Sequence, residues 1–153
     1  MKKPKTWALV ADGARARVLR GIEADRPGAP LEFASKAATS HLGEMMADQA
    51  GRSFTSSGTG RRSGMELGSD PVRRDMQDFA RETFQALEKH HRKGAFERLA
   101  IFAAPKMLGI LRDEMPAGLR DSVILEKPAN LLWQSDAELL ASVREAIDEI
   151  SSL

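Results

Sequence analysis

The run RLAIFAAP, residues 98–105, limits the fold more than any other part of this 153-residue chain. It is short and continuously apolar from Leu99 to Ala104, as is typical of a strand buried on both faces. A helix with a single apolar stripe precedes the run, and Pro105 opens another helix after it. A strand set between two helices belongs to crossover connections, which place neighbouring strands in parallel. The run therefore predicts the parallel part of a sheet on which helices pack.

The most regular segment lies just before that run, at residues 71–92. Asp70 suits the N-cap of a helix, and Pro71 suits the first helical position, where a missing N–H costs nothing. Cationic residues crowd the last turn, where they suit the helix dipole, and Gly94 provides the exit. Apolar residues recur at steps of three and four and predict one buried stripe. The stripe consists of Val72, Met76, Phe79, Ala80, Phe84 and Leu87.

Elements on either side of this helix complete the predicted fold. Three strands joined by tight turns, one at Asp12-Gly13, come before it and indicate an antiparallel meander. After it, helices and strands alternate, and Ser135 with Glu138 forms a capping box for the last helix. The predicted strands lie near residues 6–12, 15–22, 31–38, 98–104 and 121–126. The predicted helices cover residues 71–92, 105–114 and 136–150.

The predicted fold class is therefore α/β: one domain over residues 1–153, with a mixed sheet in which an antiparallel β-meander is followed by αβαβα crossovers. Trp7 and Trp133 are expected to be packing residues. The exposed edges of such a sheet also predict a homodimer. The predicted core consists of Phe79, Phe84, Leu87, Ile101, Leu108, Leu111, Val123, Leu125, Leu140, Val143 and Ile147.

Composition and charge exclude several kinds of function. The chain has no cysteine, which excludes a disulfide framework, a thiolate nucleophile and cysteine-ligated zinc. Its net charge of +1 does not call for a nucleic-acid partner, so an electrostatic argument depends on local clusters. The apolar run WALVA near the start is shorter than the roughly 7–15 residues of a signal peptide, and no segment approaches the ~20 of a membrane span. We expect a cytoplasmic protein without a membrane partner.

The patterns of conventional enzymes are missing from the sequence. It contains no phosphate-loop pattern, and no G-x-S-x-G elbow follows a predicted strand. His90 and His91 are adjacent, so on a helix their side chains diverge by about 100° and do not suit one metal ion. We therefore expect no metal and no cofactor, and a protein that is not a conventional enzyme.

Asp12 and Arg15 are the polar residues of most interest in the first hairpin. A metal-dependent nuclease needs several carboxylates around ions about 3.5–4 Å apart, and the other predicted strands supply almost none. A turn role for Asp12 therefore explains it better than a catalytic one. Both residues remain candidates for a polar site.

The segment GRSFTSSGTGRRSG, residues 51–64, combines three arginines with glycine, serine and a phenylalanine, and it contains no acid. Arg52, Arg61 and Arg62 could neutralise phosphates, with Arg73 and Arg74 following at the helix start, while Phe54 could stack on a base. The alternative is a solvated flexible loop. A second candidate anion site lies at the turn Ala103 to Lys106, beyond the carboxyl end of a parallel strand, where helix N–H groups and Lys106 meet. An ordinary strand-to-helix turn is the alternative there.

Three stretches together resemble the bacterial host attachment protein family: WALVADGARARVL, RSF inside the Gly/Ser/Arg segment, and KGAFERLAIFAAPKMLGILRDEMP. The resemblance runs from about Trp7 to about Ala129. It implies a link to attachment of bacteria to a host, but no chemical activity. The family in turn resembles the middle domain of archaeal and eukaryotic class 1 translation release factors, with a ribonuclease-H-like mixed sheet.

In the release factors, a long loop before the long helix carries Gly-Gly-Gln into the peptidyl-transferase centre of the ribosome. The corresponding segment here is 51–64, and the sequence contains no Gly-Gly-Gln. The resemblance therefore implies a fold and an RNA-facing loop rather than ester hydrolysis. We expect a non-catalytic domain that binds RNA or the ribosome. The alternatives are a hydrolase acting on a peptidyl-tRNA-like ester and a protein–protein interaction module that affects attachment indirectly.

Overall fold

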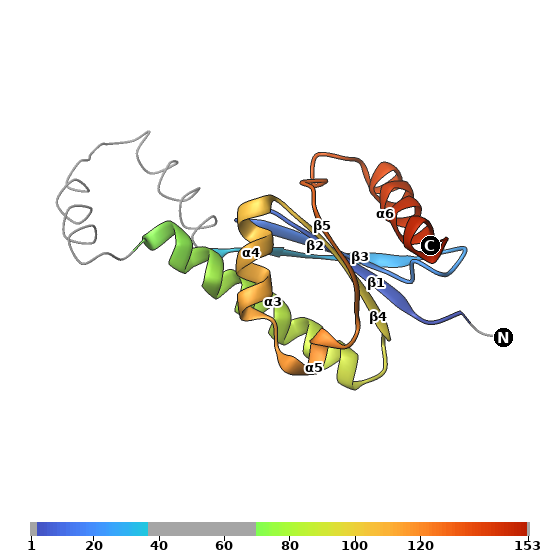
Figure 1. Cartoon of the computed structure of the whole chain (residues 1–153), viewed down its shortest axis with the longest axis horizontal. Coiled ribbons are helices and arrows are strands. Elements are labelled where there is room, and N and C mark those ends of the chain that lie inside the picture. Colours follow the sequence, from blue (N-terminus) through green and yellow to red (C-terminus); the bar gives the residue numbers. More distant parts are fainter. Residues whose placement is uncertain (1–2, 37–69, 153) are drawn as a thin grey trace.

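A mixed sheet forms the centre of the protein in a computed structural model that describes residues 3–36 and 70–152 (Figure 1). In this part of the chain the sheet has five strands, in the order β3-β2-β1-β4-β5. β2 pairs antiparallel with β1 and with β3, whereas β4 pairs parallel with β1 and with β5. The predicted meander and the predicted parallel half are both confirmed. The strands are β1 (Thr6–Ala11), β2 (Arg15–Arg20), β3 (Gly28–Ala34), β4 (Arg98–Ala103) and β5 (Val123–Pro128).

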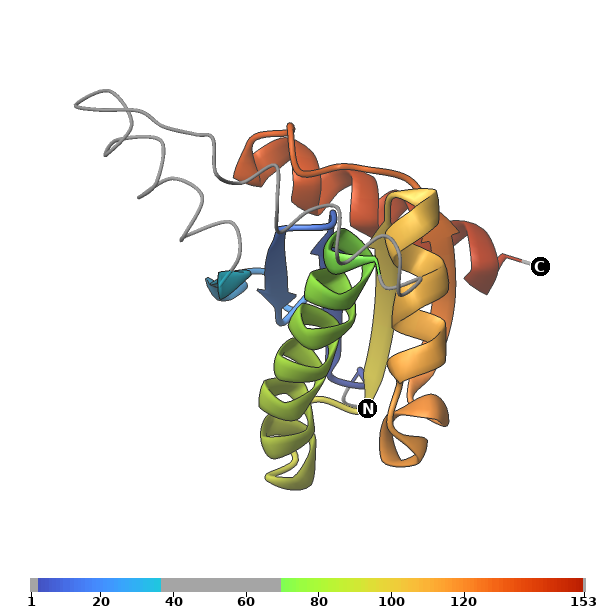
Figure 2. The ribbon, with the colours of Figure 1, turned by 90° about the vertical axis from the view of Figure 1, so that its left-hand side faces the viewer.

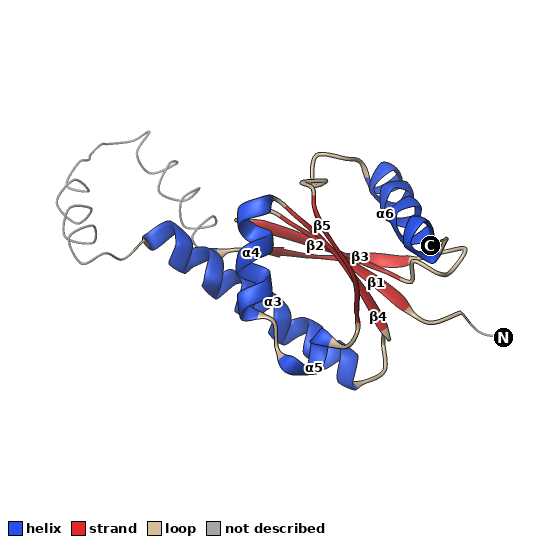
Figure 3. Cartoon of the chain, viewed as in Figure 1, coloured by secondary structure: helices blue, strands red, loops and turns tan. Residues whose placement is uncertain are grey.

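Helices cover both faces of this sheet (Figures 2 and 3). Of the helices in the described part of the chain, three lie on one face: α3 (Pro71–Arg92), α4 (Pro105–Glu114) and α5 (Ala117–Arg120). The fourth, α6 (Asp136–Ser151), lies on the other face. The mixed α/β class is thus confirmed, while the release-factor-like or ribonuclease-H-like topology stays a prediction.

The helix ends follow from the local sequence. Oδ1 of Asp70 accepts the N–H of Arg73 at 3.1 Å, so that Asp70 caps α3 as predicted. Gly94 has a φ of +79°, which a residue with a Cβ rarely adopts, and the chain turns there after α3. Ser135 and Glu138 form both hydrogen bonds of the predicted capping box of α6.

Alternation along the two central strands divides the core in two. Trp7 and Leu9 of β1, like Leu99 and Ile101 of β4, face the layer of α3 and α4. The intervening residues, such as Val10 and Phe102, face α6. A strand buried on both faces has apolar residues at successive positions, which explains the apolar run at 98–105.

Some predicted packing positions are more exposed than expected. Val123 and Leu125 are only partly buried because β5 is an edge strand, and Leu140 packs at the margin of the α6 core. Val72 is 62% exposed because the start of α3 extends beyond the sheet (Figure 1). Trp133 is 75% exposed in the loop between β5 and α6, so its prediction as a packing residue is wrong, whereas that of Trp7 is confirmed.

Several boundaries also differ from the prediction. β2 ends at Arg20 rather than at residue 22, and β5 covers Val123–Pro128 rather than residues 121–126. β3 begins at Gly28 rather than at residue 31, because Gly28 pairs with Arg20 of β2. The short helix α5 follows Pro116, which the sequence marked only as the end of the preceding helix. The predicted strand residues 37 and 38 lie outside the described residues.

Candidate functional site at the carboxyl edge of the sheet

The hairpin turn between β1 and β2 lies at the carboxyl edge of the parallel strands. Oδ1 of Asp12 accepts the backbone N–H groups of Ala14 and Arg15, both at 2.8 Å. The N–H of Asp12 in turn donates to the carbonyl of Arg15 at 3.0 Å. The carboxylate therefore closes the turn as a side-chain acceptor, which confirms the predicted turn role of Asp12. It also fixes the position at which Arg15 enters β2.

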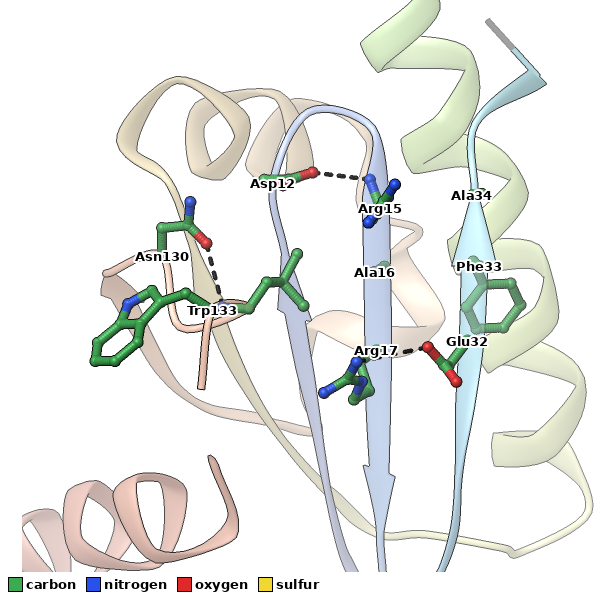
Figure 4. A pocket seen from close by; sticks show the side chains of 10 residues that line it. Asp12, Arg15, Ala16, Arg17, Glu32, Phe33, Ala34, Asn130 and Trp133 are labelled. Carbon is green, nitrogen blue, oxygen red and sulfur yellow. Dashed lines mark hydrogen bonds and ion pairs between the residues drawn. The ribbon is translucent and has the colours of Figure 1, made fainter. Parts of the chain in front are cut away.

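A groove of about 530 Å³ opens beside this turn, and we call it the β2–β3 groove (Figure 4). The turn and the first half of β2 form one side of it, and β3 and the loop between β5 and α6 complete it. It is lined by Asp12, Arg15, Ala16, Arg17, Glu32, Phe33, Ala34, Asn130, Leu132 and Trp133.

The two arginines of the groove differ in their partners. Arg17 is paired twice, with Glu32 at 3.5 Å and with Asp136 of α6 at 3.1 Å, and its side chain is only 23% exposed. Arg15 is exposed, and its guanidinium forms no ion pair or hydrogen bond with any residue that the structure describes. Arg17 therefore holds β2, β3 and α6 together, while Arg15 is free to bind an anion.

The loop between β5 and α6 forms the outer rim of the groove. Oδ1 of Asn130 accepts the N–H of Leu132 at 3.2 Å, and the N–H of Gln134 donates to the carbonyl of Leu131 at 3.0 Å. These bonds hold the loop in a turn that presents Trp133 at its surface (Figure 4). Because Asn130 uses its oxygen within the loop, its amide N–H groups face outward as donors.

The other candidates predicted from the sequence lie outside this groove. Lys106 is exposed in the first turn of α4, where the N-cap residue Ala104 has no side-chain cap. Arg73 pairs with Asp113 at 3.9 Å, and Arg74 is exposed and unpaired among the described residues. Both lie in the first turn of α3. Arg52, Phe54, Arg61 and Arg62 lie outside the described residues.

The histidines of α3 have packing partners at the opposite edge of the sheet. The ring of His90 lies 5.1 Å from that of Trp7, and the ring of His91 lies 5.1 Å from that of Phe96. Within residues 3–36 and 70–152, no group of three or more His, Cys, Asp or Glu side chains could hold a metal ion.

Sequence reasoning identified Asp12 and Arg15 but missed Arg17, Asn130 and Trp133. The ion pair of Arg17 with Asp136 joins residues 119 positions apart, which no local pattern predicts. Trp133 did carry a signal: it lies outside every periodic segment, between the last strand and the capping box. A large aromatic residue in such a loop is a candidate for an exposed contact residue.

None of the helices in the described part of the chain combines the length and the apolar character that a membrane span requires.

Comparisons with known proteins identify the family of this chain. No curated protein matches the sequence. A family model described as "Protein required for attachment to host cells" matches residues 7–143, most of the chain. The chain therefore belongs to this family of proteins required for attachment to host cells.

Proposed function

We propose that the protein serves attachment to host cells as a non-catalytic binding protein, and that its β2–β3 groove binds a single-stranded segment of RNA. The observation that carries the proposal is that one groove holds a largely exposed tryptophan and an arginine whose guanidinium has no partner among the described residues. Arg15 offers the cation and Trp133, at 75% exposure, offers the aromatic face.

The chemistry of the groove suits one nucleotide and its phosphate. The planar guanidinium of Arg15 can donate two parallel hydrogen bonds to phosphate oxygens. A base can stack on Trp133, and such stacking contributes about 1–3 kcal/mol per base. The outward amide of Asn130 can donate to an acceptor on the edge of that base. A ligand with both a flat apolar part and an anionic part would satisfy all three residues.

Further cations at the same edge favour a strand of RNA over a free nucleotide. Lys106 lies in the first turn of α4 and Arg74 in the first turn of α3, and neither side chain is paired within the described residues. The sequence of residues 51–64, which precedes α3, adds Arg52, Arg61 and Arg62 without an acid. The resemblance to the release-factor middle domain supports the choice of RNA and of the ribosome as the RNA-bearing partner. On this proposal the protein acts from the cytoplasm and affects attachment indirectly.

Fluorescence anisotropy with a labelled 12-nucleotide RNA tests the groove. We expect Arg15→Gln and Trp133→Ala each to weaken binding about tenfold, and Arg15→Gln to reduce the salt slope by about 0.7, the value for one phosphate contact on a single strand. Arg26→Gln is the matched charge control because Arg26 is exposed on the turn before β3. Val72→Ala is the control for Trp133, since Val72 is the other large exposed apolar residue among those described.

The fold should survive these changes, because substitution of an exposed side chain shifts stability by no more than about 0.5 kcal/mol. Binding by both groove variants at wild-type strength would refute the proposal. So would turnover of an ester substrate that Asp12→Asn abolishes.

A further inference from the structure

A second charged surface lies at the amino edge of the sheet, opposite the β2–β3 groove. We call it the amino-end basic surface, and it consists of Lys5, Lys89, Arg92 and Lys93. The fold brings these residues together from positions more than 80 apart in sequence. The carbonyl of Lys5 accepts the N–H groups of Glu97 at 2.8 Å and Arg98 at 3.0 Å, and its Nζ donates to the carbonyl of Gly94 at 3.1 Å. Lys5 is thereby fixed beside Gly94, just after the end of α3.

All four side chains of this surface are exposed. Two acids lie close by: Glu88 pairs with Arg92 at 3.7 Å, and Glu97 accepts the backbone N–H of Lys5 at 3.2 Å. Lys89 and Lys93 have no ion pair with any residue that the structure describes. Neighbouring Lys3 does not belong to the surface, because it shares a hollow with acidic Glu23, Asp25 and Asp148. The surface thus holds more cations than acids on a chain whose net charge is only +1.

Capping of α3 does not account for these side chains. Backbone N–H groups already close the helix end: Lys93 donates to the carbonyl of Lys89, Gly94 to that of His91 and Ala95 to that of His90. The side chains of Lys89, Arg92 and Lys93 donate to none of these carbonyls. The cationic groups of Lys89 and Lys93, which have no ion pair with any described residue, are therefore available to a partner in solution.

We propose that the amino-end basic surface binds the phosphate backbone of a nucleic-acid duplex. Contacts to phosphates need charge and position but no aromatic platform. The aromatic residues beneath this surface, Trp7 and Phe96, are buried and unavailable for stacking, which excludes the mode of binding proposed for the groove. A membrane surface is the other polyanion to consider, but peripheral membrane binding joins basic residues to an inserted apolar face. The large exposed apolar residues among those described, Val72 and Trp133, are not part of this surface.

The proposal is independent of the groove, because it concerns other residues and a duplex rather than a single strand. Its test uses the full-length protein and a labelled 20-base-pair RNA duplex, with affinity measured by anisotropy between 50 and 200 mM salt. The double variant Lys89→Gln and Lys93→Gln removes two unpaired charges. We expect its salt slope to fall by nearly 2, since each phosphate contact on a duplex contributes about 0.9.

A matched double variant, Lys36→Gln and Lys127→Gln, changes the net charge equally at two exposed lysines elsewhere and should bind the duplex like the wild type. An unchanged salt slope in the Lys89/Lys93 variant would overturn the proposal, as would an equal loss in the matched variant. Sedimentation with vesicles containing phosphatidylserine completes the test, and binding to vesicles but not to the duplex would assign the surface to a membrane instead.

Discussion

The roles of single side chains in this protein can be predicted from the sequence only in part. Asp12 was predicted as a turn residue, because an Asp-Gly pair between two short apolar runs is a local signal. No local pattern settles how exposed Trp133 is, although its place outside every periodic segment is a signal, because the exposure depends on the path of the loop between β5 and α6. The same holds for Arg17, whose two partners lie on different elements. The local role of a residue can thus be predicted from the sequence, whereas its partners on distant elements cannot.

Replacing Asp12 tests its role at this scale. Asp12→Ala removes the acceptor for two backbone N–H groups, and we expect the free energy of unfolding to fall by about 1–2 kcal/mol. Asp12→Asn keeps a side-chain oxygen in the same place and should lose less than half as much. Urea denaturation followed by circular dichroism gives both values. An alanine variant as stable as the wild type would mean that these hydrogen bonds do not support the hairpin.

At the scale of elements, the helices were more predictable than the strands. α3, α4 and α6 begin at the predicted residues because their start signals are local, such as Asp70 for α3 and Ser135 for α6. The start of β3 instead depends on pairing with β2, and the partial burial of β5 depends on its place at the edge of the sheet. Sheet order and edge position arise from contacts between distant segments, so no local pattern contains them.

The capping box of α6 predicts a pH dependence. The backbone N–H of Ser135 donates to the carboxylate of Glu138, and this bond, with a second contribution from the Ser135 side chain, lowers the pKa of Glu138 from its ordinary 4.5. A lowered folded-state pKa means that ionised Glu138 stabilises the fold above pH 4.5, and that this contribution is lost as the pH falls through the lowered pKa.

Glu138→Gln should therefore destabilise the protein at neutral pH and remove part of the decline of stability on acidification. Thermal unfolding at pH 7 and at stepwise lower pH measures the difference in stability between the wild type and Glu138→Gln. This difference should narrow as the pH falls. Asp136→Asn is not a suitable control, since Asp136 pairs with Arg17. Glu145→Gln is suitable, because Glu145 takes no part in the capping box. A difference that stays constant with pH would contradict the assignment.

At the scale of the whole molecule, the central strand β1 separates the two proposed surfaces. The β2–β3 groove lies at its carboxyl end beside Asp12, and the amino-end basic surface lies at the start of the strand beside Lys5. A buried strand paired on both sides is a rigid spacer, so we expect the surfaces to act independently. The homodimer predicted from the sheet edges remains a prediction, which sedimentation velocity can test.

Co-sedimentation with ribosomes at low and high salt tests the molecule as a whole, because ribosomal RNA offers both single strands and duplexes. We expect Trp133→Ala and the Lys89/Lys93 double variant each to reduce pelleting, and their combination to add the two losses in free energy, as distant sites do to within about 0.5 kcal/mol. The triple variant Arg52→Ala, Arg61→Ala and Arg62→Ala tests the basic segment 51–64 in the same way, with the greatest loss of affinity at low salt, where phosphate contacts contribute most. If every variant pelleted like the wild type, neither the two surfaces nor the segment 51–64 would carry the interaction. If the wild type did not pellet at low salt, the ribosome would be excluded as the partner. The oligonucleotide measurements would then decide separately whether either surface binds RNA.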